Sequence, residues 1–304
     1  MAALAPVVSV LMLTYNHAAY LQQAIASVQA QSLQAWELLI GEDGSSDHTA
    51  TIAHQAAASD GRIRVFSSPG GSLGFHRNFG RLLEAARGPY VAFLEGDDWW
   101  SEPRKLQLQV ALLERDSSLA FCGGRTRVLD QRLGCSEVPP PIGPASGLLK
   151  LSLPQLIDAY SFHFSSVLMR RQVVELPPWI FRQYCLDRPL YLLAACHGDA
   201  GVIDTELSVY RLHGGGAWAP LSPLQKAIRS RSLFQTFRHN FPAKFHSRFS
   251  RSLSHILWHY LALALQARRR REALVILAMG VSAAPFLRLF QEPRITLGAL
   301  LRIV

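Results

Sequence analysis

Cysteine is scarce in this chain of 304 residues, and its four cysteines form no CxxC pair. They are Cys122, Cys135, Cys185 and Cys196. A zinc ribbon needs paired cysteines and a disulfide framework needs regular spacings, so the sequence argues against both and suits a reducing compartment. Charged residues make up only 17% of the chain and hydrophobic residues 49%, a composition that favours a folded protein over a disordered one.

Long hydrophobic runs are also missing. A membrane span needs about 20 consecutive apolar residues, and the stretch 273–287 is interrupted by Gly280, Ser282 and Pro285. The apolar residues 1–17 lack a basic start and a small-residue cleavage site, so a strand fits them better than a signal peptide. Neither GxGxxG nor GxxxxGK[ST] occurs, which argues against dinucleotide dehydrogenases and P-loop enzymes.

The positive charge is concentrated at one end of the chain. Residues 220–304 hold 14 lysines and arginines against two acids, a net charge of +12, whereas residues 1–219 carry −3. Such a basic block attracts polyanions. The sequence therefore predicts two domains, 1–219 and a basic helical extension over 220–304.

Buried strands alternate with amphipathic helices in the first part of the chain. Aliphatic and β-branched runs predict strands at 7–13, 36–40, 63–66, 90–94, 119–129, 164–169 and 201–212. Helical spacing predicts helices at 17–31, 47–58, 75–86, 102–114 and 188–196. The alternation is typical of an α/β fold with a mostly parallel central sheet and helices on both faces.

Acidic residues gather where the expected strands end. Glu95, Asp97 and Asp98 follow the strand at 90–94, and Asp43 follows the strand at 36–40. Ligands of parallel sheets bind at these carboxyl ends. Neighbouring carboxylates repel one another unless a cation neutralises them, and oxygen ligands favour Mg²⁺ or Mn²⁺. The cluster predicts a divalent metal site, with Gly96 allowing a sharp turn; the alternative is that Asp98 only begins the next helix.

Three further residues are open to two interpretations each. The carboxylate of Asp43 can accept hydrogen bonds from a nucleobase or a ribose, or it can belong to a simple Asp-Gly turn. Asp187, two residues before Pro189, can be a general base or the cap of a helix. His213 precedes three glycines and can be a surface residue or a metal ligand; we expect it to complete the metal shell when this loop closes.

Five ordered motifs carry a resemblance to a known family. They are VSVLMLTYN at 8–16, EDGSSDHT at 42–49, RNFG at 77–80, GPYVAFLEGDDWW at 88–100 and YRLH at 210–213. Together they resemble the family-2 glycosyltransferases of the GT-A fold, most strongly over 6–113 and more thinly to about residue 213. Glu95 stands where the family usually has an aspartate, and Leu186 stands where many members have an acid.

The resemblance implies a Rossmann-like GT-A fold and an inverting transfer of sugar from a nucleoside diphosphate sugar, usually linked to uridine. Asp97 and His213 would hold the metal, with Asp98 as a further candidate, and Asp187 would deprotonate the acceptor hydroxyl. The residues expected to bind the donor are Thr14, Tyr15, Asn16, Asp43, Arg77, Asn78, Glu95, Gly96 and Asp97.

Two other classes of function stay open. A metal-dependent nucleotidyltransferase usually needs a basic glycine-rich loop after its first strand, and the residues after 13 do not form one. A non-catalytic nucleotide-sugar binding module would hydrolyse no nucleotide sugar.

The expected acceptor is a glycan or lipid-linked hydroxyl in cell-surface polysaccharide synthesis. We expect a cytoplasmic protein that is peripheral on the inner membrane, where the run Arg268–Arg271 and the apolar stretch after it would meet anionic lipid. The alternative is that these helices pack as a hairpin on the catalytic domain. Nucleic acid is not expected, because the basic run lacks interleaved aromatic residues.

Overall fold

The structure is a computed structural model that describes residues 5–68, 70–139, 148–158, 162–216, 218 and 220–283, with the backbone alone at 281–283. The chain divides into two compact units. The first comprises 1–153 and 161–213, and the second comprises 154–160 and 214–304. The second unit thus begins six residues before the expected boundary at 220 and includes a short segment from the middle of the chain.

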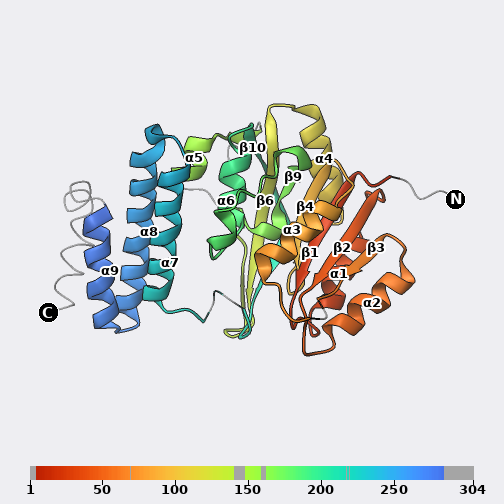
Figure 1. The fold of residues 1–304 in the computed structure, drawn as a ribbon, viewed down its shortest axis with the longest axis horizontal. Helices are drawn as coiled ribbons and strands as arrows, with labels where there is room; N and C mark the ends of the chain where they lie inside the picture. The colour runs from red at the N-terminus through yellow and green to blue at the C-terminus, as the bar shows by residue number, and fades with distance from the viewer. Residues whose placement is uncertain are drawn as a thin grey trace. The chain divides into compact units, whose positions relative to one another are not determined.

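The first unit is built on one mixed sheet (Figure 1) with the strand order β3-β2-β1-β4-β9-β6-β10-β5. Its strands are β1 (Val8–Thr14), β2 (Trp36–Glu42), β3 (Ile63–Phe66), β4 (Tyr90–Glu95), β5 (Trp99–Trp100), β6 (Leu119–Asp130), β7 (Cys135–Glu137), β8 (Leu149–Leu151), β9 (Leu168–Arg170) and β10 (Asp199–Leu212). The long pairs β1–β2, β1–β4, β2–β3 and β6–β10 are parallel. The predicted mostly parallel sheet is confirmed.

Helices cover both faces of this sheet. They are α1 (Leu21–Gln29), α2 (Thr49–Ser59), α3 (Phe75–Ala85), α4 (Lys105–Arg115) and α6 (Asp187–Ala194). Alternate residues of β1, among them Val10 and Met12, share one buried core with α1, α2 and α4. Phe93 of β4 points to the opposite face, where its ring lies 5.7 Å from that of Phe79 on α3.

The strand expected over 164–169 is wrong in its first half. Phe164–Ser166 form a 3-10 turn, and only Leu168–Arg170 form a strand, β9, which runs antiparallel to β4 and β6. The Ser165 N–H donates to Nδ1 of His163, and the Ser166 hydroxyl donates to the carbonyl of the same histidine. These local hydrogen bonds compete with sheet pairing and turn the chain.

The second unit is helical and has a core of its own. It contains α7 (Pro223–Asn240), α8 (His246–Gln266) and α9 (Arg270–Ala283), together with most of the short α5 (Leu153–Asp158). The rings of Phe234, Phe237 and Phe249 are buried and lie 5.5–6.2 Å apart. A capping box between Ser222 and Gln225 begins α7. The expected helical extension is present, and none of the described helices is long and apolar enough to cross a membrane.

Candidate active site

Hydrogen bonds hold three strand ends together at one edge of the sheet. Leu13 of β1 is the register partner of Glu95 at the end of β4, and the Gly96 N–H donates to the Leu13 carbonyl at 2.8 Å. On the other side, the Asp43 N–H donates to the Thr14 carbonyl at 3.1 Å. The acidic residues after β2 and after β4 therefore flank the end of the same strand.

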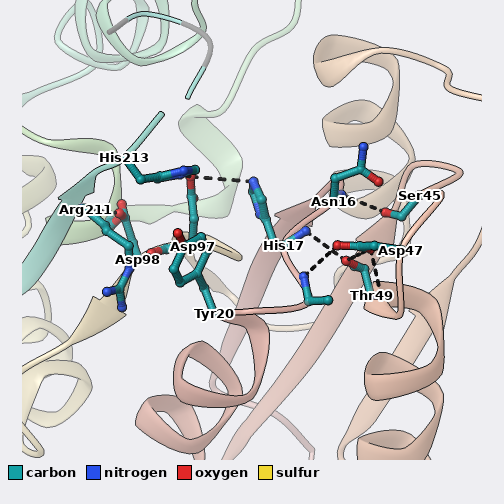
Figure 2. Close-up of polar contacts among 12 residues, drawn as sticks. Asn16, His17, Tyr20, Ser45, Asp47, Thr49, Asp97, Asp98, Arg211 and His213 are labelled. Carbon is teal, nitrogen blue, oxygen red and sulfur yellow. Dashed lines mark hydrogen bonds and ion pairs between the residues drawn. The ribbon is translucent and has the colours of Figure 1, made fainter. Parts of the chain in front are cut away.

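Asp97 lies between two histidines (Figure 2). Its Oδ2 is 3.0 Å from Nε2 of His213 and 3.5 Å from Nε2 of His17. Burial acts to raise the pKa of Asp97, but the His213 hydrogen bond and the charge of His17 outweigh it and lower the pKa below its usual value. The predicted pair of Asp97 and His213 is thus close in space, and His17 is a third member that the sequence did not single out.

Asp98 is buried and has two hydrogen-bond partners. Its Oδ2 accepts from the Ser165 hydroxyl at 2.6 Å, and its Oδ1 accepts from the Arg211 N–H at 3.0 Å. Burial and the nearby charge of Asp97 raise its pKa well above the usual range. Helix α4 begins only at Lys105, so the interpretation of Asp98 as the start of a helix is wrong. Asp98 instead joins the loop after β4 to the 164–166 turn and to β10.

The pKa of Glu95 indicates that several negative charges lie close together at this site. Burial raises its pKa well above the usual range, and the charges of Asp97, Asp98 and Asp187 raise it further. Because the charge of Asp187 contributes to the pKa of Glu95, Asp187 lies close enough to interact electrostatically with the cluster. Asp187 is the first residue of α6, while Leu186 occupies the N-cap position, so the interpretation of Asp187 as the cap is wrong.

The residues of this cluster fit a divalent cation. Ligand atoms of Glu95, Asp98 and His163 all lie within 4.8 Å of one another. Thr14 Oγ1 and His17 Nδ1 are buried and have no hydrogen-bond partner among the residues that the structure describes, and they lie 2.7 and 2.9 Å from the point that a Cβ at Gly96 would occupy. Carboxylate oxygens with imidazole nitrogens suit Mn²⁺ or Mg²⁺, and a cation would offset the excess negative charge.

Arg211 holds the two sides of the cluster together and was missed in the sequence. Its guanidinium lies 4.6 Å from the ring centre of Tyr20 and 4.6 Å from that of Trp99. Nε donates to the Asp97 carbonyl at 2.9 Å, and an Nη donates to Gln23 at 2.7 Å. The YRLH motif contains this arginine, but the motif does not reveal which aromatic rings surround it.

Asp43 is more than a turn residue. It is 5% exposed, and its carboxylate accepts from the Leu73 N–H at 2.7 Å, the Gly74 N–H at 3.0 Å and the Ser72 hydroxyl at 2.6 Å. Gly44 has a φ of +74°, and an added Cβ there would lie 3.1 Å from the backbone of Gly71. Asp43 therefore fastens the glycine-rich loop 70–74 to the end of β2.

The remaining expected donor residues fall into two groups. Asn16 and Asn78 are structural ties: the Asn16 Oδ1 accepts from the Ser46 N–H at 2.9 Å, and the Asn78 Nδ2 donates to the Gly41 carbonyl at 2.8 Å. Tyr15 and Arg77 are exposed to solvent beside them. The two exposed side chains are free to meet a ligand, while the two asparagines shape the strand ends.

Arg81 is a second residue that the sequence did not single out. Its guanidinium donates to Asn78 Oδ1 at 2.8 Å and to the carbonyls of Phe66 and Glu42 at 2.7 and 3.1 Å. It thereby joins the ends of β2 and β3 behind the loop. In the sequence, its position one helical turn after Arg77 in α3 could have indicated that it also lies near the site.

The sequence profile described as glycosyl transferase family 2 matches residues 9–175, which is more than half of the chain. The chain belongs to this family. An uncharacterized protein of Mycobacterium tuberculosis is 31% identical over 214 residues, covering 69% of this chain and 60% of that protein. The putative teichuronic acid biosynthesis glycosyltransferase TuaG of Bacillus subtilis is 38% identical over 120 residues, covering 39% of this chain and 46% of TuaG.

Solved structures agree with the fold. S. aureus TarS in complex with UDP-GlcNAc matches with a TM-score of 0.65 at 16% identity, over 91% of this chain and 81% of that one. A mannosyltransferase from Pyrobaculum calidifontis in complex with GDP-Man and Mn²⁺ matches with a TM-score of 0.62 at 17% identity, over 98% and 86%. The family-2 assignment and the GT-A fold expected from the motifs are confirmed.

Proposed function

We propose that this chain is an inverting glycosyltransferase that moves a sugar from a nucleoside diphosphate sugar to a hydroxyl group. The observation that carries the proposal is the convergence of Glu95, Asp97 and Asp98 at the strand ends, with Asp187 in electrostatic reach. We assign catalysis to residues 1–219. TarS binds UDP-GlcNAc and the mannosyltransferase binds GDP-Man, which supports a nucleotide-sugar donor here, with a uridine nucleotide as our first choice.

The nucleotide would lie over the ends of β1 and β2. Asp43 would accept a hydrogen bond from the base, in competition with the N–H groups of Leu73 and Gly74 that now occupy its carboxylate. Tyr15, half exposed, would lie along the base. Arg77, at the exposed start of α3, would meet the diphosphate together with the backbone N–H groups of that helix terminus.

Asp97 and His213 would hold the divalent ion, with Asp98 as a weaker candidate because both of its oxygens already accept hydrogen bonds. When bound, Mg²⁺ or Mn²⁺ supplies Lewis-acid stabilisation of the diphosphate leaving group. Thr14, Asn16, Asn78 and Gly96 would shape the donor site, and Glu95 would face the sugar nucleotide from the end of β4. A neighbour that binds Mn²⁺ with its donor supports this assignment.

Asp187 would act as the general base. It begins α6, is only partly buried and contributes to the raised pKa of Glu95, so it lies close to the cluster and is reachable from solvent. A carboxylate there can take the proton of the attacking hydroxyl. One displacement with one base inverts the anomeric carbon.

The acceptor would be a glycan or lipid-linked hydroxyl in cell-surface polysaccharide synthesis, in keeping with the similarity to TuaG, a putative teichuronic acid biosynthesis glycosyltransferase. The helical extension, residues 220–304, would contact the anionic cytoplasmic face of the inner membrane. Arg270 and Arg271 are exposed at the start of α9, and Leu274 and Val275 on the next turn are 51% and 47% exposed. Residues 284–287 of the apolar stretch lie outside the described residues.

The test is release of nucleotide from UDP-, GDP-, TDP- and CMP-sugars by the purified protein, with and without Mn²⁺. Metal-dependent release from one donor supports the proposal. Formation of a sugar nucleotide and diphosphate from a sugar phosphate and a nucleoside triphosphate would indicate a nucleotidyltransferase instead. Donor binding in calorimetry without turnover, over a panel of acceptors, would indicate a binding module.

A further inference from the structure

A groove of about 120 Å³ lies between α7 and α8 in the helical unit. Arg231, Gln235 and Arg238 form its α7 rim, and all three are exposed. Their spacing of four and then three residues puts them on one face of the helix. The two arginines are separated by about 10.5 Å along the helix axis, so two guanidinium groups border the same groove.

The floor of the groove is apolar. Phe234 of α7 and Phe249 of α8 are 1% and 0% exposed, and Leu253 lies one turn farther along α8. Hydrocarbon beneath a cationic rim fits an amphiphile, whose anionic group can meet the arginines while its first methylene groups cover the ring edges.

The groove arginines have no acidic partner in the described part of the helical unit. Its two described acids are already paired: Asp158 with Arg248, and Glu272 with Arg269. Guanidinium groups bind phosphate oxygens in pairs of hydrogen bonds. The groove arginines therefore have no acidic partner within the described part of the unit. Because they border an apolar floor, they are suited to bind an anion from outside the unit.

We infer that this groove binds the phosphate headgroup of an anionic lipid. Arg231 and Arg238 hold the phosphate oxygens, Gln235 donates between them, and the phenylalanine floor contacts the first part of the acyl chain. The inference rests on the proposed membrane contact of residues 220–304 and makes it more specific. Attachment depends on one site and not on the total positive charge.

The first experiment is co-sedimentation of the full chain with vesicles of phosphatidylglycerol and phosphatidylcholine, and with vesicles of phosphatidylcholine alone. Arg231→Gln/Arg238→Gln removes the rim, and Arg229→Gln/Arg251→Gln removes the same charge from exposed positions of α7 and α8 that do not line the groove. We expect the rim variant to bind the anionic vesicles about 30-fold more weakly, since it loses two charge-assisted contacts. The control should lose about threefold, the effect of screened surface charge.

A second pair of variants works even if the rim variant folds poorly. Ser250 lines the groove on α8, and Ser247 is exposed near the start of the same helix. A carboxylate at position 250 would repel the phosphate or occupy the arginines. Ser250→Asp should therefore weaken binding to anionic vesicles by about tenfold, while Ser247→Asp should leave it within about twofold.

Three results would overturn the inference. Equal losses in the two double variants would reduce the groove to general surface charge and leave the proposed membrane contact intact. Equal binding of the wild-type chain to both vesicle types would remove the membrane contact as well. Inorganic diphosphate that protects the groove arginines from a guanidinium-reactive reagent, when vesicles do not, would assign the site to a free anion.

Discussion

The two units of this chain differ in the sign and the exposure of their charged side chains. In the sheet unit, burial raises the pKa values of Glu95 and Asp98 well above their usual range, and the charges of neighbouring carboxylates raise them further. In the helical unit, both described acids are paired, and the groove arginines are left exposed. One unit therefore gathers its acidic side chains at the strand ends, and the other exposes its basic side chains on the surface.

Replacing Asp97 should have the largest effect on the acidic cluster formed by Glu95, Asp97 and Asp98. We expect Asp97→Ala to abolish turnover while the protein stays folded, because the change removes the carboxylate that lies between His17 and His213 and leaves the diphosphate without its cation. Metal-dependent nucleotide release and circular dichroism are the measurements. Glu84→Gln, at an exposed acid on α3, is the control, and full wild-type activity in excess EDTA would falsify the metal requirement.

The next largest effect separates base catalysis from metal binding. Asp187→Asn should reduce the rate of transfer by about 10²–10⁴-fold, the usual contribution of a general base, with little change in donor affinity. Stopped-flow rates and calorimetric titration with the donor measure the two quantities. Should the variant turn over normally, Asp187 has no part in proton transfer, and Asp199, Asp204 and Glu206 are the next residues to replace.

Replacing Arg211 tests whether its contacts hold the acidic cluster in position. Arg211→Met should lower kcat by about 100-fold, because the loops that carry Asp97 and His213 lose their shared cation and can shift by about 1 Å. Arg211→Lys keeps the charge but not the planar stack between Tyr20 and Trp99, so it should restore only part of the rate. Recovery to the wild-type rate with lysine would show that charge alone matters at this position.

The sheet unit also buries a basic side chain, that of Lys105. Lys105 is 0% exposed, its Nζ donates to Gln109 at 2.7 Å, and burial lowers its pKa from 10.5 to about 7. Between these two pH values the unfolded chain binds a proton that the native lysine has released. The free energy of unfolding should therefore rise with pH from about 7 upward, by at most ~1.4 kcal/mol per pH unit.

Lys105→Met should remove this rise while leaving the other titrating groups in place. Urea denaturation of both proteins at several pH values between about 7 and 8.5 measures the difference in slope. This range lies below the usual value of 9.0 for a thiol, so the neighbouring Cys122, whose pKa is raised to about 12, stays mostly protonated in both states. Parallel slopes for the two proteins would mean that Lys105 stays charged in the native core.

The sequence predicted the sheet unit well because its evidence is local. Continuous aliphatic runs such as 8–13 place strands, and acids that follow two of those runs must meet at one sheet edge. Asp97 was predicted in this way, and His213 was predicted from the glycine loop that follows it. His17 and Arg211 were missed because their importance depends on distant partners, Asp97 in one case and the rings of Tyr20 and Trp99 in the other.

The helical unit was predicted only as helical and basic. Composition gives the net charge of 220–304, but it does not tell which arginines are paired. Glu272 pairs with Arg269 at a local spacing of three residues, whereas Asp158 pairs with Arg248 across 90 residues, which no local pattern records. The groove followed only from the packing of α7 on α8, since Arg231 and Arg238 look like any other exposed arginines in the sequence.

The hydrogen bond between Gln23 and Arg211 spans 188 residues. During synthesis, α1 and the loop after β4 leave the ribosome long before β10 does. Until β10 is added, Asp98 lacks its backbone donor, Asp97 lacks His213, and the aromatic rings of Tyr20 and Trp99 have no cation between them. The contacts around Asp97 and Asp98 are therefore the last that the sheet unit acquires, and a chain that ends before residue 199 carries the acidic motif without them.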